Sequence, residues 1–322
     1  MRTIVVTKNG GPEVLELQDA DVPRPEAGQV LVDIEAIGVN YRDIYEREGN
    51  YPGTPPPPHV AGVEGAGTVA EVGADVTDVS VGDRVAWIQG QGSYAEQVVV
   101  DAAKVLPVPD GLSSELAAAA LLQGMTAHYL ATSTYPVQEG DWVIVHAAAG
   151  GVGLLLTQIV KLRGGRVIAT TSTDDKAQLA REAGADEVAG YDSFAERAGE
   201  LTDGEGVAVV YDGIGKATFD DGLASLGRRG LMVVYGAASG PPAPVEVGSL
   251  NAGGSLYLTR PSLPHYTATR DELLERSQDV FGWIADGSLD VRIGGRYPLE
   301  DGRKAQEDLA ARATTGKLLL SP

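Results

Sequence analysis

The 322-residue sequence predicts an α/β protein that joins a β-rich module to a doubly wound parallel sheet. Short β-branched runs separated by Gly, Pro, Asp and Asn turns fill residues 1–113. Strand and helix patterns alternate after residue 113, as in a parallel sheet with helices on both faces. A glycine-rich turn within residues 141–165 joins a strand to a helix, as in dinucleotide-binding proteins.

The glycine-rich turn comprises residues 147–153, between an apolar strand at 142–145 and an apolar helix that ends at Gly164. Glycines let the backbone approach a pyrophosphate, and the free N–H groups at the helix start attract its charge. Ala148 occupies the place of the first glycine in G-x-G-x-x-G, and a simple glycine turn is the alternative interpretation. The residues expected to contact the cofactor here are Ala149, Gly150, Gly151, Val152 and Gly153.

The N-terminal module is expected to be a barrel or sandwich with one short helix. Its predicted strands are residues 4–7, 14–17, 30–37, 67–72, 83–88 and 94–100. Residues 51–58, Tyr-Pro-Gly-Thr-Pro-Pro-Pro-Pro, cannot form regular structure and predict a stiff loop. We interpret this loop as the edge of a cleft, and a proline-rich partner motif is the alternative.

The second half begins with a capped helix at Ser114. The strands expected after it are residues 142–146, 166–171, 187–189, 207–211, 231–235 and 255–260. Two helices, 270–285 and 301–312, and two strands, 290–297 and 317–320, complete the chain. The final strand has no βαβ partner, so the C-terminus is expected to return to the N-terminal module. The predicted domains are 1–120 and 261–322 for the β-rich module and 121–260 for the nucleotide domain.

Composition describes an ordinary globular protein, with 43 % hydrophobic and 22 % charged residues. No apolar stretch is long enough to span a bilayer, and no secretory signal is visible at the N-terminus. The chain has no Cys, which excludes disulfides and thiolate metal sites. We therefore expect a soluble cytoplasmic protein.

The chain is strongly acidic, with 45 Asp and Glu against 25 Lys and Arg and a net charge of −20. Such a charge repels phosphate backbones and anionic lipid, so neither nucleic acid nor membrane is an expected partner. Adaptation to high salt is one explanation, because screening relieves repulsion among surface carboxylates. An ordinary acidic cytosolic protein is the other explanation.

Four segments carry a resemblance to a known family: residues 10–15 (GGPEVL), 36–43 (AIGVNYRD), 146–153 (HAAAGGVG) and 254–262 (GSLYLTRPS). Together with residues 312–317 (RATTGK), they resemble the zinc-free, zeta-crystallin-type quinone oxidoreductases of the medium-chain dehydrogenase/reductase superfamily. The resemblance implies a GroES-like catalytic domain, a Rossmann domain and a site in the cleft between them. It also implies a homodimer formed by edge strands of the Rossmann sheets, with residues 255–260 as the candidate edge.

Zinc-containing relatives use Cys and His ligands, whereas the four His of this chain are scattered at His59, His128, His146 and His265. Glu64 lies in a G-x-E-x-x-G pattern common to the superfamily, but its metal-binding partners are absent. We therefore expect no metal site. His146, at a strand end, is interpreted as a structural histidine rather than a base.

The expected cofactor is NADPH. The end of the second strand of the nucleotide domain lacks the acid that marks NAD. Lys176 follows, and a lysine can contact a 2′-phosphate. Asp174 and Asp175 weaken this interpretation unless they point outward, and an ordinary solvated Lys176 is the alternative. By resemblance, the residues around the 2′-phosphate are Ser172, Lys176, Tyr191 and Arg312.

Reduction of a quinone needs a positioned hydride donor and groups that stabilise charge on the carbonyl oxygen. The catalytic candidates, which match cleft residues of the family, are Asn40, Asp43, Tyr45 and Tyr51. Asn40 can donate to an oxygen, and the tyrosines can donate or stack; ordinary packing is the alternative for each tyrosine. Further cofactor contacts are expected from Tyr41, Thr126, Gly236, Ala237 and Ser239, and Gln123 replaces a lysine frequent in the family.

The expected function is NADPH-dependent quinone reduction by direct hydride transfer, without zinc or flavin. Reduction of the double bond of an enal or enone needs the same hydride geometry and is the second enzymatic interpretation. A NADPH-binding structural or RNA-binding protein, as occurs among crystallin-like relatives, is the alternative from another class. The net charge of −20 disfavours RNA binding.

Overall fold

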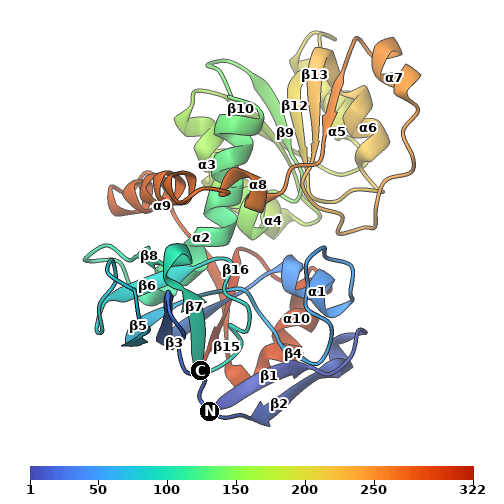
Figure 1. The fold of residues 1–322 in the computed structure, drawn as a ribbon. Coiled ribbons are helices and arrows are strands. Elements are labelled where there is room, and N and C mark those ends of the chain that lie inside the picture. The colour runs from blue at the N-terminus through green and yellow to red at the C-terminus, as the bar shows by residue number, and fades with distance from the viewer. The chain divides into compact units, whose positions relative to one another are not determined.

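A computed structural model describes all residues, Met1–Pro322, and separates them into two compact units (Figure 1). Unit 1 comprises Met1–Leu122, Thr269–Ala285 and Val291–Pro322, and unit 2 comprises Gln123–Ala268 and Asp286–Asp290. The first boundary therefore falls two residues after the expected position at 120, within helix α2 (Ser114–Tyr129). The return to unit 1 begins at residue 269 rather than 261, and the short segment 286–290 belongs to unit 2.

Unit 1 is built on a seven-stranded sheet and a three-stranded sheet. The large sheet has the order β15-β16-β3-β5-β6-β8, with β7 pairing β3. Its strands are β3 (Gln29–Val39), β5 (Glu64–Val72), β6 (Arg84–Trp87), β7 (Gln97–Asp101), β8 (Leu106–Pro107), β15 (Ile293–Pro298) and β16 (Lys317–Ser321). The small sheet contains β1 (Arg2–Val6), β2 (Leu15–Asp19) and β4 (His59–Val60). The last strand, β16, runs antiparallel to β3, so the large sheet combines strands from the N-terminal and C-terminal parts of the chain.

The helices of unit 1 flank these sheets and cover a core in which Trp87, Tyr94 and Ile37 are fully buried. Helix α1 (Tyr41–Arg47) follows β3 after a single residue, Asn40. The other helices are α9 (Arg270–Ala285), α10 (Gly302–Ala310) and three single turns, η1 (Pro12–Val14), η2 (Ala102–Lys104) and η4 (Leu299–Asp301).

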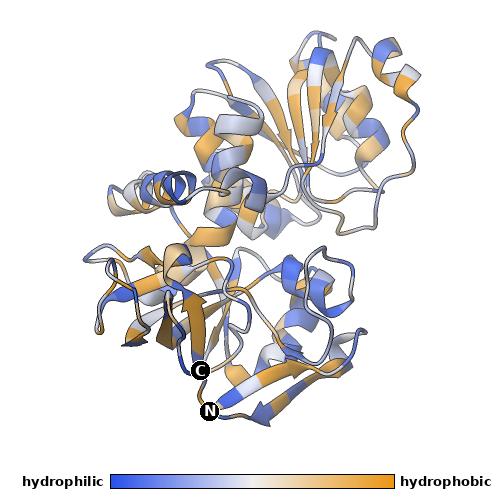
Figure 2. Ribbon diagram, in the orientation of Figure 1, coloured by the Kyte–Doolittle hydropathy of each residue, from blue (hydrophilic) through white to orange (hydrophobic).

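Unit 2 is a six-stranded parallel sheet with the order β11-β10-β9-β12-β13-β14. Its strands are β9 (Trp142–Val145), β10 (Arg166–Thr170), β11 (Glu187–Ala189), β12 (Val207–Asp212), β13 (Leu226–Val234) and β14 (Tyr257–Thr259). In chain order this is the 3-2-1-4-5-6 arrangement of a Rossmann sheet, which binds dinucleotides where the strand order reverses. Figure 2 shows its central strands as hydrophobic, as expected for strands covered on both faces.

The connections of unit 2 are mostly helical. After α2 comes a π-helical turn, η3 (Leu130–Thr134), and the helices that follow are α3 (Gly151–Leu162), α4 (Asp174–Glu182), α5 (Phe194–Leu201), α6 (Phe219–Ala224), α7 (Val247–Ala252) and α8 (Leu263–Tyr266). No helix of either unit is both long and apolar enough to cross a membrane. The predicted fold class is confirmed.

Several strand boundaries differ from the sequence prediction by one or more residues, and two of these differences have identifiable reasons. The strand predicted at 94–100 begins at Gln97, because the backbone of Tyr94 bonds to Ala61 and Ile4 instead of joining the large sheet. Strand β13 begins at Leu226 rather than at residue 231. The glycines and arginines at 227–230 interrupt the apolar pattern from which the strand was predicted. Among them Arg229 has a φ of 61°, and the ladder to β12 shifts register there.

Candidate functional site

The glycine-rich turn of unit 2 connects the end of β9 to the start of α3, and Gly150 is the N-cap of the helix. Ala147 has a φ of 52°, which turns the chain sharply after the strand. A Cβ atom at Gly153 would lie 2.6 Å from Cα of Ala148 and would also overlap the Ala147 carbonyl oxygen. Only glycine at position 153 therefore lets the first turn of α3 pack this close to the strand end.

Gly150, Gly151 and Val152 are half-buried, whereas Ala149 and Gly153 are buried. The first backbone N–H groups of the twelve-residue helix α3 start at the half-buried residues. Unpaired N–H groups and the positive end of the helix dipole favour a phosphate at this position. The turn therefore fits the pyrophosphate of a dinucleotide, with Gly153 as the close-packing glycine.

The end of β10 carries the residues expected near the 2′-phosphate. Thr173 caps α4, with its hydroxyl accepting from the Lys176 backbone N–H at 3.3 Å. Asp174 and Asp175 are exposed, and the Lys176 side chain is half-buried. Ser172 is exposed and Tyr191 is half-buried, and no acid lies between Thr170 and Thr173.

His146 is fully buried at the end of β9. Its Nδ1 lies 2.8 Å from the Thr170 hydroxyl, and its ring meets Phe194 edge-on at 4.7 Å. Burial lowers the pKa of His146 to about 3, so the ring is neutral at physiological pH. These contacts are typical of a structural histidine, which here links the ends of β9 and β10.

Asp212, at the end of β12, organises a second glycine-rich crossing and was missed by the sequence analysis. Its buried carboxylate accepts from the backbone N–H groups of Ile214 (2.7 Å) and Gly215 (2.9 Å) and from the Thr218 hydroxyl. Burial raises the pKa of Asp212, and these hydrogen bonds oppose the rise. The Ser239 hydroxyl donates to the Ile214 carbonyl at 2.8 Å, which ties the loop containing Gly236 and Ala237 to the first loop.

In unit 1, the buried carboxyl group of Asp43 caps the start of α1. The Asp43 carboxylate accepts from the backbone N–H of Asn40 at 2.8 Å and from the Tyr94 hydroxyl at 3.0 Å, both through Oδ2. Its other oxygen is buried and makes no hydrogen bond. Burial, together with the nearby Glu46, raises the pKa of Asp43 to about 7, although Asn40, Tyr94 and Lys317 act in the opposite direction.

A buried ion pair lies beside Asn40. The Lys317 ammonium, on β16, donates to Glu64 Oε2 at 2.5 Å and to Asn40 Oδ1 at 2.8 Å. The Asn40 amide donates to Glu64 at 2.8 Å and to the Gly38 carbonyl at 3.2 Å. Glu64 Oε1 accepts from the Leu122 backbone N–H at 2.7 Å. Both N–H donors and the carbonyl oxygen of the Asn40 side chain thus make hydrogen bonds within unit 1, and its donation to a substrate stays a prediction.

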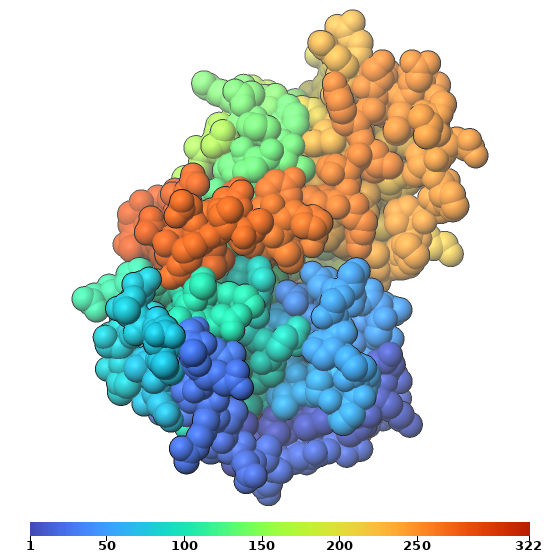
Figure 3. Space-filling model, in the orientation of Figure 1, coloured from blue at the N-terminus to red at the C-terminus, as the bar shows by residue number.

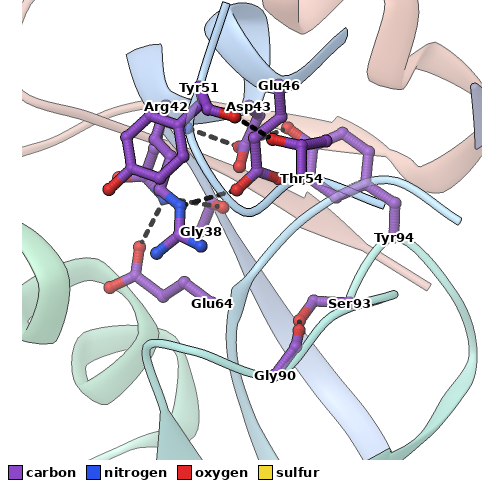
Figure 4. Close-up of polar contacts among 11 residues, drawn as sticks. Gly38, Arg42, Asp43, Glu46, Tyr51, Thr54, Glu64, Gly90, Ser93 and Tyr94 are labelled. Atoms are coloured by element: carbon purple, nitrogen blue, oxygen red, sulfur yellow. Dashed lines mark hydrogen bonds and ion pairs between the residues drawn. The ribbon is translucent and has the colours of Figure 1, made fainter. Parts of the chain in front are cut away.

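Tyr41, Arg42 and Tyr45 lie on α1 and are partly exposed, as is Tyr51 in the following loop. Tyr41 and Tyr45 share a face, with ring centroids 6.2 Å apart, and the Tyr41 hydroxyl donates to the Leu309 carbonyl. Burial raises the pKa of Tyr41, and the charge of Arg312 lowers it. The Tyr51 ring covers the Arg42 guanidinium at 4.7 Å (Figure 4).

The predicted site residues are divided between the two units. Asn40, Asp43, Tyr41, Tyr45, Tyr51 and Arg312 belong to unit 1; Thr126, buried on α2, and the remaining predicted cofactor residues belong to unit 2. Lys317 appeared in the sequence analysis only within a family motif and as the start of the final strand, and Tyr94 only within a strand. The available signal for Lys317 was a lysine inside an otherwise apolar final strand, which requires a buried partner.

The residues present do not fit a zinc ion. No group of three or more His, Cys, Asp or Glu side chains is placed to hold a metal. Glu64, the one acid of the superfamily pattern, is paired with Lys317. An ammonium in contact with this carboxylate leaves no place for a second cation.

A β-rich unit that contains both chain ends, together with a dinucleotide-binding parallel sheet, defines a medium-chain dehydrogenase/reductase. Residues 26–110 match the alcohol dehydrogenase GroES-like domain, and residues 151–268 match the family described as zinc-binding dehydrogenase. The chain is 46 % identical to a quinone oxidoreductase of Salmonella typhimurium, over 98 % of each chain. It belongs to the quinone oxidoreductase family of this superfamily.

Two further relatives bear on the site. The crystal structure of Escherichia coli quinone oxidoreductase complexed with NADPH has a TM-score of 0.97 and 42 % identity, and covers 100 % of both chains. A 2-haloacrylate reductase from a Burkholderia species is 39 % identical over 99 % of this chain and 98 % of the relative.

Replacing Lys317 by Met should lower the free energy of unfolding by about 3–5 kcal/mol, because it leaves the Glu64 carboxylate buried without its cation. Urea and thermal unfolding at neutral pH would measure the change. Lys304→Met is the matched control: its pair with Asp308 is exposed, so the loss should stay below about 1 kcal/mol. Adding Glu64→Gln to Lys317→Met should restore part of the loss, and a fully stable Lys317→Met protein would contradict this account.

The stability of the protein should depend on pH through Asp43. Its pKa in the folded state, about 7, lies above the ordinary value of 3.8 for an aspartate. Its protonation therefore favours folding below about pH 4, and this contribution is lost as pH rises through about 7. Relative to Asp43→Asn, which does not titrate, the wild type should lose a few kcal/mol over this range. Chemical unfolding at intervals of pH would test this, and a constant difference between the two proteins would refute it.

Proposed function

We propose that this protein reduces quinones with NADPH by direct hydride transfer, and that it needs neither zinc nor flavin. The main support for this proposal is full-length similarity to quinone oxidoreductases, one of which has a crystal structure in complex with NADPH. When bound, NADPH would supply the hydride, and the protein would supply binding, orientation and electrostatic stabilisation. The absence of a fitting metal-ligand group supports the zinc-free part of the proposal.

In this proposal, unit 2 supplies most of the residues that bind the cofactor, and Tyr41 and Arg312 come from unit 1. Residues 149–153 bind the pyrophosphate through backbone N–H groups at the start of α3, and Gly153 allows the required close packing. Ser172, Lys176, Tyr191 and Arg312 are assigned to the 2′-phosphate. The two acids beside Lys176, Asp174 and Asp175, are exposed and are the first two residues of α4. Thr126, Gly236, Ala237 and Ser239 are assigned to the rest of the cofactor.

Unit 1 is proposed to supply the polar groups on the substrate side. The hydroxyls of Tyr45 and Tyr51 are assigned to the substrate oxygen, where charge develops during reduction. Tyr41, which shares a helix face with Tyr45, is assigned to cofactor contact. Asn40 and Asp43 are bonded within the protein, so we assign them to holding the start of α1 in place.

Reduction of an activated carbon–carbon double bond is the second candidate function. The relative described as a 2-haloacrylate reductase, 39 % identical to this chain, favours it. The same hydride geometry serves both reactions, so the ratio of kcat/KM for a quinone and for an enal separates them. A purely structural role would be set aside by measurable turnover.

We also propose a homodimer formed through β14. This strand is the outermost of the parallel sheet, and only β13 pairs with it. Tyr257 and Leu258 on it are exposed, which leaves an apolar edge strand open to pairing with a second copy.

We propose adaptation to high salt as one explanation of the net charge of −20. The alternative is an ordinary acidic cytoplasmic protein. Screening would then raise both stability and activity as salt increases. Steady-state NADPH oxidation and thermal unfolding, each measured at low and at multimolar salt, test this proposal. A cytoplasmic location remains an expectation.

Replacing Lys176 by Ala should raise KM for NADPH by about 10- to 100-fold, because one charge-assisted phosphate contact is lost. KM for NADH, which has no 2′-phosphate, should change little. Steady-state oxidation of each cofactor with a quinone and with an enal measures this, with Lys8→Ala as an exposed-lysine control. Chelator should leave the activity intact; zinc-dependent recovery after chelation, or no turnover with either acceptor, would contradict the proposal.

The molar mass in solution should be twice the 33.5 kDa of the chain. Leu258→Asp places a charge on the open edge of β14 and should yield monomers, measured by light scattering. Leu17→Asp, on the exposed strand β2 of unit 1, is the matched control and should remain dimeric. A monomeric wild type would refute the dimer without affecting the assignment of the cofactor.

A further inference from the structure

Arg42, the second residue of α1, is held in one position by two neighbours (Figure 4). Its Nε donates to Glu46 Oε1 at 2.7 Å, one helical turn later, and the Tyr51 ring lies 4.7 Å from its guanidinium carbon. The Arg42 side chain is only 18 % exposed, and that of Glu46 is 4 % exposed. An arginine fixed on two sides loses little further conformational freedom when it binds a ligand.

The two terminal nitrogens of Arg42 remain available. Neither Nη1 nor Nη2 makes a hydrogen bond or ion pair within the protein, and neither is a buried unpaired atom. Glu46 contacts the guanidinium only at Nε, so the edge formed by Nη1 and Nη2 is unoccupied. Two parallel N–H groups on a planar fork match the two oxygens of a carboxylate.

The charges around Arg42 leave this edge attractive to an anion. The Glu46 carboxylate pairs with Arg42 at Nε and offsets part of its charge, but it does not occupy the edge formed by Nη1 and Nη2. Glu64 is neutralised by Lys317, and the pKa of Asp43, raised to about 7, reduces the average charge of that carboxyl near neutral pH. The net charge of −20 of the whole chain disfavours nonspecific binding of anions to the rest of the surface. A preference for anionic acceptors would therefore need a local cation such as Arg42.

Arg42 also lies among the residues assigned to the substrate. Tyr45 follows it by three positions on α1, and Tyr51 covers its guanidinium. Figure 3 shows the medium-blue segment that contains α1 and residues 51–58 at the surface of unit 1. This segment is therefore accessible on that face of the unit.

We propose that Arg42 determines acceptor specificity by binding a carboxylate, and that the preferred acceptors are quinones that carry a carboxylate group. The inference rests on the proposed quinone reduction and names its substrate class. The fixed fork of Arg42 orients such an acceptor through two N–H···O bonds, while Tyr45 and Tyr51 face its carbonyl oxygen.

The test compares a naphthoquinone that bears a carboxylate side chain with its methyl ester, at saturating NADPH. The measured quantity is kcat/KM for the acid divided by kcat/KM for the ester. The ratio should exceed one in the wild type and fall about 10- to 100-fold in Arg42→Gln, which removes the charged fork. In Arg42→Lys, which keeps the charge and loses the fork, the ratio should fall by a smaller factor.

Arg303→Gln is the matched control. Arg303 also pairs through Nε with a glutamate four residues later, Glu307 at 3.0 Å, but its side chain is 52 % exposed. This variant makes the same change of charge in the same unit and should keep the wild-type ratio.

The outcomes separate this inference from the proposed function. If the wild type reduces the ester and Arg42→Gln keeps the wild-type ratio, the role of Arg42 is overturned and quinone reduction stands. If the wild type binds NADPH but reduces neither compound, the proposed function fails as well. Should Arg42→Gln fail to fold, Arg42→Lys decides, because an unchanged ratio in that variant also overturns the inference.

Discussion

The buried ion pair between Glu64 and Lys317 is the interaction on which the β-rich unit depends. It joins the first residue of β5 to the first residue of β16, with β3 between the two strands. Asn40, at the end of β3, bonds to both charges and begins α1. Removing either charge would leave the other uncompensated in the interior, so the start of α1 and the closing strand of the sheet are coupled.

The fold was largely predictable because each signal was local. The alternation of strands and helices after residue 113 and the turn at 147–153 predicted the parallel sheet, and the unpaired final strand predicted the return of the chain. Other features depend on distant partners. Strands β4 and β8 are two residues long, too short for any periodic pattern, and form only because neighbouring strands are present.

The hydrogen-bond partners of the candidate site residues were not predictable from the sequence. Asn40 and Asp43 were selected as groups that could reach a substrate, yet their side chains are bonded to Lys317 and Tyr94, far away in the sequence. Single-sequence patterns do not reveal such long-range pairing. Asp212 was missed because the predicted strand ended one residue too early, so the acid that organises the second crossing was not recognised.

The separation of Glu64 and Lys317 by 253 residues affects the order in which the β-rich unit assembles. During synthesis β3, β5 and α1 emerge long before β16, so Glu64 would have no cation until β16 has been made. A nascent β-rich unit would therefore keep this carboxylate hydrated and its sheet open, while the continuous segment of unit 2 is already complete. The arrival of β16 then closes the sheet and supplies the cation that the start of α1 requires.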